Sequence, residues 1–426
     1  MSFSKRIIIM LIAASPILFP GFVFAQKVTS TERVVINNLS MTDYESFKKS
    51  AMPLIRTMSA KRIIGLGEGT HGTSEFYKLR YWISRIMIEE YGYNYIGFEN
   101  DFGDLWQLNQ DLNGTKDLKE SMKRYIYSIW QKEEVLEFLE WIRLWNIKHK
   151  TKVTIAGVDY ALIETDVNVL LKLMQLDVKP EIITAVKQLQ EPAFLQDQLW
   201  EGKYKTNFRE DMSEVRKKSS RAYKLADSIE KIILADSFPL SIKKDCVIAI
   251  SNIKQGVGPF HHRTEESERD SFMAANVKMH LTDSSDKMIV WAHNAHLSKK
   301  AVYDNSVGGM GGFLLKLYPD NYFVLGTGTA DGTYAGTREP KPTNNNKMEV
   351  FKLESPIKDS WEQLFKSNAS DKFYVLTKSL TEEIKPTRFV GYGTESGKGT
   401  YDKASLASLY DGYIFIRTTH AGQQLK

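Results

Sequence analysis

The stretch GLGEGTHG at residues 65–72 places a glutamate, Glu68, and a histidine, His71, among four glycines. The β-branched run before it predicts a strand over residues 62–67, and the helical period after it predicts a helix over residues 74–92. Glycines let the intervening turn bend sharply and approach a ligand without shielding the two ionisable side chains. The stretch therefore predicts a strand, a turn and a helix, with two reactive groups on the turn.

Short β-branched or aromatic runs alternate with long segments of helical period along the rest of the chain, as in a largely parallel sheet covered by helices. Further strands are predicted at residues 95–99, 152–159, 287–293, 322–328, 372–378 and 412–419. Residues 161–285 show helical period and no convincing strand, and the Gly-, Pro-, Asn- and Thr-rich residues 331–350 favour a loop. We therefore predict the α/β class: a mainly parallel central sheet flanked by helices, with an inserted helical lobe at about 161–285 forming one side of the active-site cleft.

The N-terminus has the pattern of a secretory signal. Lys5 and Arg6 form a positive start, residues 7–24 are almost wholly apolar, and small residues precede a cleavage point after Ala25. We predict a signal peptide at 1–25 and an exported protein, periplasmic or secreted.

An uncleaved membrane anchor is the alternative interpretation of this segment. Pro16, Pro20 and Gly21 interrupt it, and only the shortest spanning helices would fit it. The lone Cys246 lies far away, so it offers neither a lipid attachment site beside the cleavage point nor a disulfide within one chain. We expect no stable membrane insertion after the signal is removed.

The composition of the chain limits its partners. Its 57 Lys and Arg residues and 52 Asp and Glu residues are interspersed and give a net charge of +5, which makes no case for binding nucleic acid. The 426 residues suffice for one large α/β domain or for two domains sharing a cleft. We predict a single α/β domain over residues 26–426; the sequence carries no signal for a particular oligomeric state.

Ionisable groups recur where the predicted strands end. Glu68 and His71 follow the first strand, Glu99 ends the second, Asp159 the third and His293 the fourth. Ligands of open parallel sheets bind beyond the carboxyl ends of the strands. Glu68 could instead favour a helix dipole, and Asp159 could cap the following helix. We predict a site built from Glu68, His71, Glu99 and His293.

The histidine pair His293 and His296 leaves two chemistries open. Both imidazoles face one side if the chain turns into a helix there, and with nearby glutamates they could bind zinc. The sequence has no His-Glu-x-x-His, no second cysteine, no Gly-x-Ser-x-Gly elbow and no phosphate-binding loop. We therefore expect a His/Glu site that activates water directly, with no metal and no cofactor.

Several stretches, in order along nearly the whole chain, resemble the erythromycin esterase family. The matching segments are GLGEGTHGTSEFYKLR (65–80), GFEND (97–101), WQKEEVLEFLEWIRLWN (130–146), GVD (157–159), ERDSFMAANV (268–277), WAHNAHLSK (291–299), GGMGGFLLKLY (308–318), VLGTGTADG (324–332) and GYIFIRTT (412–419). The resemblance implies a hydrolase that opens the macrolactone ester of 14-membered macrolide antibiotics by adding water, without a covalent intermediate or a required metal, and so confers resistance.

The resemblance also implies roles for individual residues. It assigns the catalytic positions to His71, Glu68, Glu99, His293 and Arg80. It maps a pair of family histidines onto His293 and His296, and it gives Arg269 and Asp270, which match one family motif, a supporting place. We predict that His296, Arg269 and Asp159 bind the substrate.

In the mechanism expected from these residues, His71 takes a proton from water as the water attacks the lactone carbonyl. Glu99 or Glu68 holds the imidazole tautomer, and His293, His296 and Arg80 are candidate oxyanion donors. Alternative functions are a metal-dependent hydrolase, an esterase acting on another ester, and a non-catalytic periplasmic protein that binds a macrocycle or haem.

Overall fold

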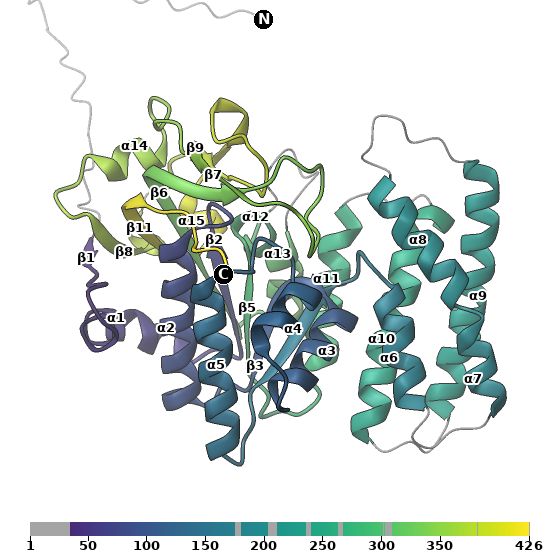
Figure 1. The fold of residues 1–426 in the computed structure, drawn as a ribbon. Helices are drawn as coiled ribbons and strands as arrows, with labels where there is room; N and C mark the ends of the chain where they lie inside the picture. The colour runs from purple at the N-terminus through teal and green to yellow at the C-terminus, as the bar shows by residue number, and fades with distance from the viewer. Residues whose placement is uncertain are drawn as a thin grey trace, which may run out of the picture. The chain divides into compact units, whose positions relative to one another are not determined.

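The computed structural model describes residues 35–174, 180–202, 211–235, 240–262, 267–300, 302, 309–380 and 382–425 (Figure 1). The predicted signal peptide at 1–25 lies outside these residues, so the signal and the exported location stay predictions. Within the described ranges, no helix combines the length and the apolar character that a membrane span needs.

The stretch that opens the sequence forms a strand, a turn and a helix, as predicted. Strand β2 (Ile63–Glu68) is buried along its whole length, and helix α2 (Ser74–Tyr91) follows after five intervening residues, the last of which is the cap Thr73. The helix ends at Gly92, which adopts φ +70°, a left-handed conformation that glycine tolerates without strain.

The central sheet is mostly parallel, which confirms the predicted fold class. Its described strands follow the order β1 (Asn37–Asn38), β8 (Lys372–Leu376), β11 (Gly412–Thr419), β6 (Tyr322–Gly336), β2, β5 (Met288–His293), β3 (Tyr95–Asp101) and β4 (Thr154–Asp159). The six strands from β11 to β4 run parallel, whereas β8 pairs antiparallel with β11, and β1 with β8. A separate hairpin joins β9 (Lys385–Arg388) to β10 (Tyr401–Ala404).

Helices cover both faces of the sheet. On one face, Ile64 and Leu66 of β2 share a core with α1 (Tyr44–Ser59), α2 and α5 (Glu133–Lys148). On the other face, Ile63 joins a core with α11 (Ser267–His280), α13 (Met310–Leu317) and α14 (Trp361–Lys366). Successive residues of β2 point to opposite sides, so a strand buried on both faces needs the near-continuous apolar run that the sequence has.

The remaining short elements connect these layers. They are α3 (Phe102–Leu112), α4 (Leu118–Tyr125), α12 (Asn294–Leu297), α15 (Leu406–Leu409) and two 3-10 turns, Thr377–Ser379 and Lys398–Thr400.

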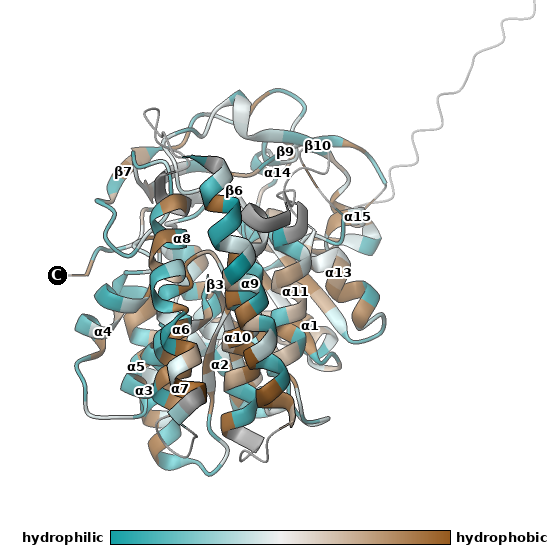
Figure 2. Cartoon of the chain, turned by 90° about the vertical axis from the view of Figure 1, so that its right-hand side faces the viewer, coloured by the Kyte–Doolittle hydropathy of each residue, from teal (hydrophilic) through white to brown (hydrophobic). Residues whose placement is uncertain are grey.

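Between β4 and β5 the described elements are all helical. They are α6 (Glu164–Met174), α7 (Pro180–Lys187), α8 (Gln190–Gly202), α9 (Met212–Ala235), α10 (Leu240–His262) and α11. Helices α6 to α10 share a core of their own, and polar and apolar residues mix along them as amphipathic packing requires (Figure 2). This segment corresponds to the predicted helical lobe, and α11 leads from it back to the sheet.

The predicted loop at 331–350 is wrong in part. Strand β6 continues to Gly336, and its end pairs antiparallel with β7 (Glu349–Lys352). At Gly332 the backbone has φ +120°, and an added Cβ would lie 1.8 Å from the carbonyl oxygen of Thr419. Glycine is needed there because the strand passes another backbone closely, and such glycines resemble a loop when only composition is considered.

Candidate active site

The carboxyl ends of four parallel strands bring the predicted residues together. Glu68 ends β2 and is paired in register with His293, which ends β5. Glu99 lies near the end of β3, and Asp159 ends β4. The sequence prediction that these groups share one edge of the sheet agrees with the structure.

The turn that carries His71 is held by backbone hydrogen bonds from distant segments. Val390 N–H donates to the Gly69 carbonyl at 2.9 Å, and His71 N–H donates to the Val390 carbonyl at 3.1 Å. The Gly72 carbonyl accepts from the N–H groups of Ala335, at 3.0 Å, and Gly422, at 2.9 Å. Gly72 has φ +71°, and a Cβ there would lie 2.0 Å from the Ala335 carbonyl oxygen. These contacts fix the position of the turn relative to the strand ends.

Glu68 links His71 to Arg80. Its Oε1 lies 2.5 Å from His71 Nδ1, and its Oε2 accepts from Arg80 Nη2 at 2.7 Å. Glu68 and Arg80 are fully buried, and His71 is 5% exposed. Among the described residues, no hydrogen bond engages Nε2 of His71, so this nitrogen can face a water molecule.

Arg80 lies in an aromatic cage. Its guanidinium carbon is 4.8 Å from the ring centre of Trp130, 4.9 Å from that of Trp291 and 5.2 Å from that of Tyr77. Its Nε and Nη1 have no hydrogen-bond partner among the described residues. The cation is thus stabilised by aromatic faces and by Glu68. Being fully buried, it can influence a substrate only through Glu68.

His293 is held in the neutral form. Its ring centre lies 4.7 Å from that of His71. Its Nδ1 accepts from Ala295 N–H at 3.3 Å, and its Nε2 lies 3.2 Å from the Val390 carbonyl, which requires the proton on Nε2. Burial, and then the nearby His71, lower the pKa of His293 well below its usual value.

Glu99 belongs to a second group of charges. Its Oε2 accepts from His293 N–H at 2.9 Å, and its Oε1 lies 3.2 Å from His296 Nε2 and 3.3 Å from Arg269 Nη2. Burial opposes its charge, but His296 and Arg269 outweigh burial and hold the pKa of Glu99 well below its usual value. Glu99 is therefore a carboxylate, and it lies against His296 rather than on the His71 ring nitrogen that Glu68 occupies.

Arg269 binds the carboxylate at the end of β4. Its Nε lies 3.2 Å from both carboxylate oxygens of Asp159, and its Nη2 donates to Oδ2 of the same group. Asp159 thus holds Arg269 and is not the side-chain cap that the sequence left as an alternative. The Arg269 side chain remains 29% exposed, so it is the cation of this group that a ligand could reach.

Two parts of the site were missed by the sequence prediction. Val390 contributes only its backbone N–H and carbonyl, and any residue type could supply these. Asp101 is fully buried beside Asp159; it accepts from the Tyr127 hydroxyl at 2.5 Å and from Leu162 N–H at 3.0 Å. Burial, and then Asp159, raise the pKa of Asp101 to about 7. Its place after GFE in the sequence could have marked it as a further strand-end carboxylate.

Within the described ranges, no group of three or more His, Cys, Asp and Glu side chains is arranged to hold a metal ion. Both ring nitrogens of His296 face carboxylates, and both of His293 face backbone groups. The roles of the predicted site residues and the absence of a metal requirement stay predictions.

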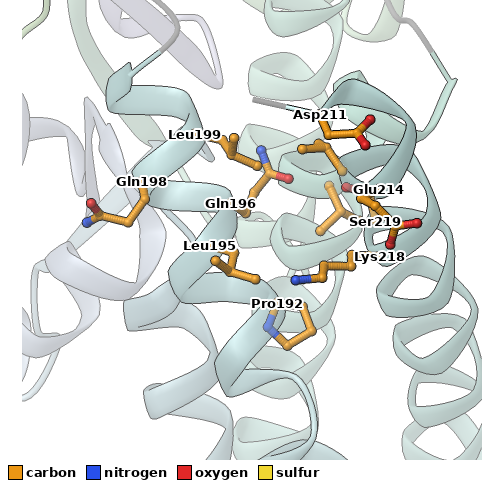
Figure 3. Close-up of a pocket in the computed structure, with 11 residues that line it drawn as sticks. Pro192, Leu195, Gln196, Gln198, Leu199, Asp211, Glu214, Lys218 and Ser219 are labelled. Atoms are coloured by element: carbon orange, nitrogen blue, oxygen red, sulfur yellow. The ribbon is translucent and has the colours of Figure 1, made fainter. Parts of the chain in front are cut away.

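A cavity of about 280 Å³ lies in the helical lobe (Figure 3). Aliphatic side chains such as Leu195 and Leu199 of α8 and Val215 of α9 line it, together with Gln196 and Lys218. None of the predicted site residues lines this cavity, so it is separate from the carboxyl edge.

Comparison with known proteins identifies the family of the chain and its fold. The family model named Erythromycin esterase matches residues 88–419. Erythromycin esterase type II from Escherichia coli is 22% identical over 415 residues, covering 89% of this chain and 94% of that protein. A crystal structure of a Bacillus cereus protein has a TM-score of 0.78 at 19% identity, covering 93% of this chain and 98% of that one. A mutant of the erythromycin esterase EreC in its open conformation has a TM-score of 0.67 at 18% identity, covering 90% and 96%.

The two structural matches show a shared fold, and the family model covers most of the chain. Because the family model matches more than half of its residues, the chain belongs to the erythromycin esterase family of hydrolases.

Proposed function

We propose that the protein opens the lactone ring of 14-membered macrolides of the erythromycin type by hydrolysis, with water activated by His71. The observation that carries this proposal is the contact of 2.5 Å between His71 Nδ1 and Glu68. It fixes the ring and leaves Nε2 to accept a proton, which is how an acid residue prepares a histidine base.

In the proposed reaction, water gives a proton to His71 Nε2 while its oxygen attacks the lactone carbonyl. Glu68 stabilises the imidazolium that forms, and buried Arg80 holds the other carboxylate oxygen of Glu68. The tetrahedral anion then collapses, the ring C–O bond breaks, and the leaving alkoxide takes the proton back from His71. The products are a carboxylic acid and an alcohol on one opened chain.

The developing oxyanion needs a donor, and Arg269 is the candidate that the geometry favours. Its side chain is 29% exposed, and one of the two N–H groups on Nη1 is directed at His296 Nε2 at 3.3 Å, which leaves the other for a substrate oxygen. His296 itself lies between two carboxylates and would act on the substrate through Glu99 and Arg269.

The test is incubation of the purified protein with a panel of 14-membered macrolides, followed by mass spectrometry. We expect a product heavier than the substrate by one water, and no product with His71→Asn. Hydrolysis of simple esters but of no macrolide would reject the macrolide substrate class and keep the esterase. Expression in a susceptible bacterium should raise the inhibitory macrolide concentration for the wild type and not for His71→Asn.

We also propose that the protein is exported by the segment at 1–25. Sequencing of the mature N-terminus should give Gln26 as the first residue. An intact Met1 on membrane-bound protein would reject the cleaved signal.

A further inference from the structure

Helix α11 begins with two adjacent charges that have different partners. Arg269 binds Asp159 and Glu99 at the strand ends. Asp270 is 2% exposed, and its Oδ1 accepts from His296 Nδ1 at 2.9 Å and from Met310 N–H at 3.1 Å. One carboxylate oxygen therefore joins α11 to the segment after β5 and to the start of α13.

His296 lies between two carboxylates. Its Nδ1 faces Asp270 and its Nε2 faces Glu99 Oε1 at 3.2 Å. A neutral imidazole has one N–H and can donate to only one of them, whereas an imidazolium donates to both. The two carboxylates favour the charged form of the ring, whereas Arg269 Nη1, 3.3 Å from Nε2, opposes it.

The charges around His296 come from every element packed on it. Glu99 comes from β3, Asp270 and Arg269 come from α11, and His293 lies three residues earlier and is neutral. Burial disfavours the cation, but Glu99 and Asp270 outweigh burial and raise the pKa of His296 to about 10. Arg269 opposes the cation, and Asp159 largely neutralises Arg269.

We propose that Asp270 is a positioning residue that keeps His296 as a doubly donating imidazolium and thereby fixes Glu99 and Arg269 at the carboxyl edge. The inference rests on the proposed function, because it gives the carbonyl-binding Arg269 its place. Asp270 acts through His296 and touches neither the attacking water nor the ester.

The position of Asp270 on α11 connects the lobe to the chemistry. A shift of α11 away from the strand ends breaks the contact of Arg269 with Asp159 and that of Asp270 with His296 at once. Arg269 and Asp270 carry opposite charges and have different partners. Together they fix the distance of α11 from the strand ends and its rotation about its own axis.

The test uses the full chain and two readouts. Side-chain ¹⁵N NMR of the wild type should show His296 with two protonated nitrogens at neutral pH. Asp270→Asn keeps the shape and an acceptor for Met310 N–H but removes one charge, so neutral His296 should appear at lower pH than in the wild type. Turnover of the macrolide should fall at least about tenfold, the scale of one charge-assisted hydrogen bond, with its alkaline limit at lower pH.

Asp270→Glu restores the charge and should recover part of the turnover and of the pH profile. Asp286→Asn is the matched control, because Asp286 is a buried carboxylate that accepts from Asn94 and from Asp283 N–H, away from the site. It should lower stability without moving the pH profile.

A neutral His296 in the wild type at neutral pH would overturn the proposal without any variant. So would an Asp270→Asn protein in which the His296 titration is unchanged. The NMR titration needs no substrate: if the wild type hydrolyses no macrolide but the titration shifts as expected, the positioning role stands and only the proposed function fails.

Discussion

Nδ1 of His71 lies 2.5 Å from Oε1 of Glu68, and no other histidine in the described part of the chain pairs with this carboxylate. Glu68 comes from the end of a buried strand, and His71 comes three residues later from a glycine-rich turn. The proposed base and the carboxylate proposed to orient it therefore belong to one short segment outside the helical lobe.

Replacing His71 should remove turnover and leave binding. His71→Ala takes away the proton acceptor but keeps the surrounding side chains, so we expect turnover to fall by about 10²-fold or more. Steady-state kinetics with a macrolide, and calorimetric titration for affinity, measure the two effects separately. Near-normal turnover in His71→Ala, with loss of turnover in His296→Ala, would show that His71 is not the base.

Replacing Arg80 should lower the free energy of unfolding of the protein. Arg80→Met leaves the buried Glu68 without its cation, and breaking a buried ion pair from one side costs about 3–5 kcal/mol. Urea denaturation measures the free energy of unfolding. Arg85→Met is the control on the same helix, because its pair with Glu89 is partly exposed and should contribute less than about 1 kcal/mol. Equal losses of unfolding free energy in the two variants would show that the buried ion pair of Arg80 contributes no more than the partly exposed pair of Arg85.

Glu99→Gln should change the pH profile as well as the rate. Glu99 is one of the two carboxylates that raise the pKa of His296 to about 10, so its removal lowers that pKa. His296 is protonated below its pKa, and the alkaline limit of activity should therefore move to lower pH. A pH series of kcat/KM for both proteins checks this, and an unmoved alkaline limit would show that Glu99 does not control His296.

The buried carboxyl group of Asp166, in helix α6 of the helical lobe, should make the protein less stable as pH rises. Burial, and then Asp101 and Asp104, raise the pKa of Asp166 well above its usual value. In the unfolded chain the pKa is about 3.9. The folded state therefore binds the proton more tightly, and this contribution to stability is present at acid pH and lost as pH rises towards the folded pKa.

Asp166→Asn should weaken that pH dependence. Urea midpoints measured between pH 5 and pH 9 should decline less steeply in Asp166→Asn than in the wild type. Identical slopes would mean that Asp166 does not hold a proton in the folded state. Asp286→Asn again serves as the control for loss of a buried carboxylate.

Gly72→Ala should displace the catalytic turn. The added Cβ would lie 2.0 Å from the Ala335 carbonyl oxygen, and φ +71° is strained for alanine by about 1–2 kcal/mol. We expect both turnover and the melting temperature to fall. At Gly393 nothing lies within 4 Å of an added Cβ, so Gly393→Ala should leave both unchanged. Full activity in Gly72→Ala would show that the turn tolerates a different path.

Periodic and local features of the sequence were predictable, because they depend on neighbouring residues. The apolar run before GLGEGTHG and the helical period after it defined β2 and α2, and the strand ends defined the common edge of Glu68, Glu99, Asp159 and His293. The resemblance to a family added Arg80 and Arg269, whose partners no spacing rule could identify.

Features that depend on distant backbone were not predictable. Val390 holds the turn of His71 through its N–H and carbonyl, which every residue type has. The end of β6 pairs with β7 although its glycines favour a loop, because close passage between backbones, as at Gly332, needs residues without side chains. The histidine partners of Glu68 and Glu99 were also not predictable, since both glutamates lie at strand ends. Only distances in the structure show that Glu68 faces His71 and Glu99 faces His296.

The helical lobe leaves the sheet after β4 and returns before β5, and α6 to α10 share a core separate from those on the sheet faces. In evolutionary terms, this segment is a module. Mutations in it are buffered from the strand register that aligns the hydrolytic groups, provided that Arg269 and Asp270 at the start of α11 are kept. A sequence change confined to this segment can therefore alter its own surface and cavity while the proposed site at the strand ends keeps its geometry.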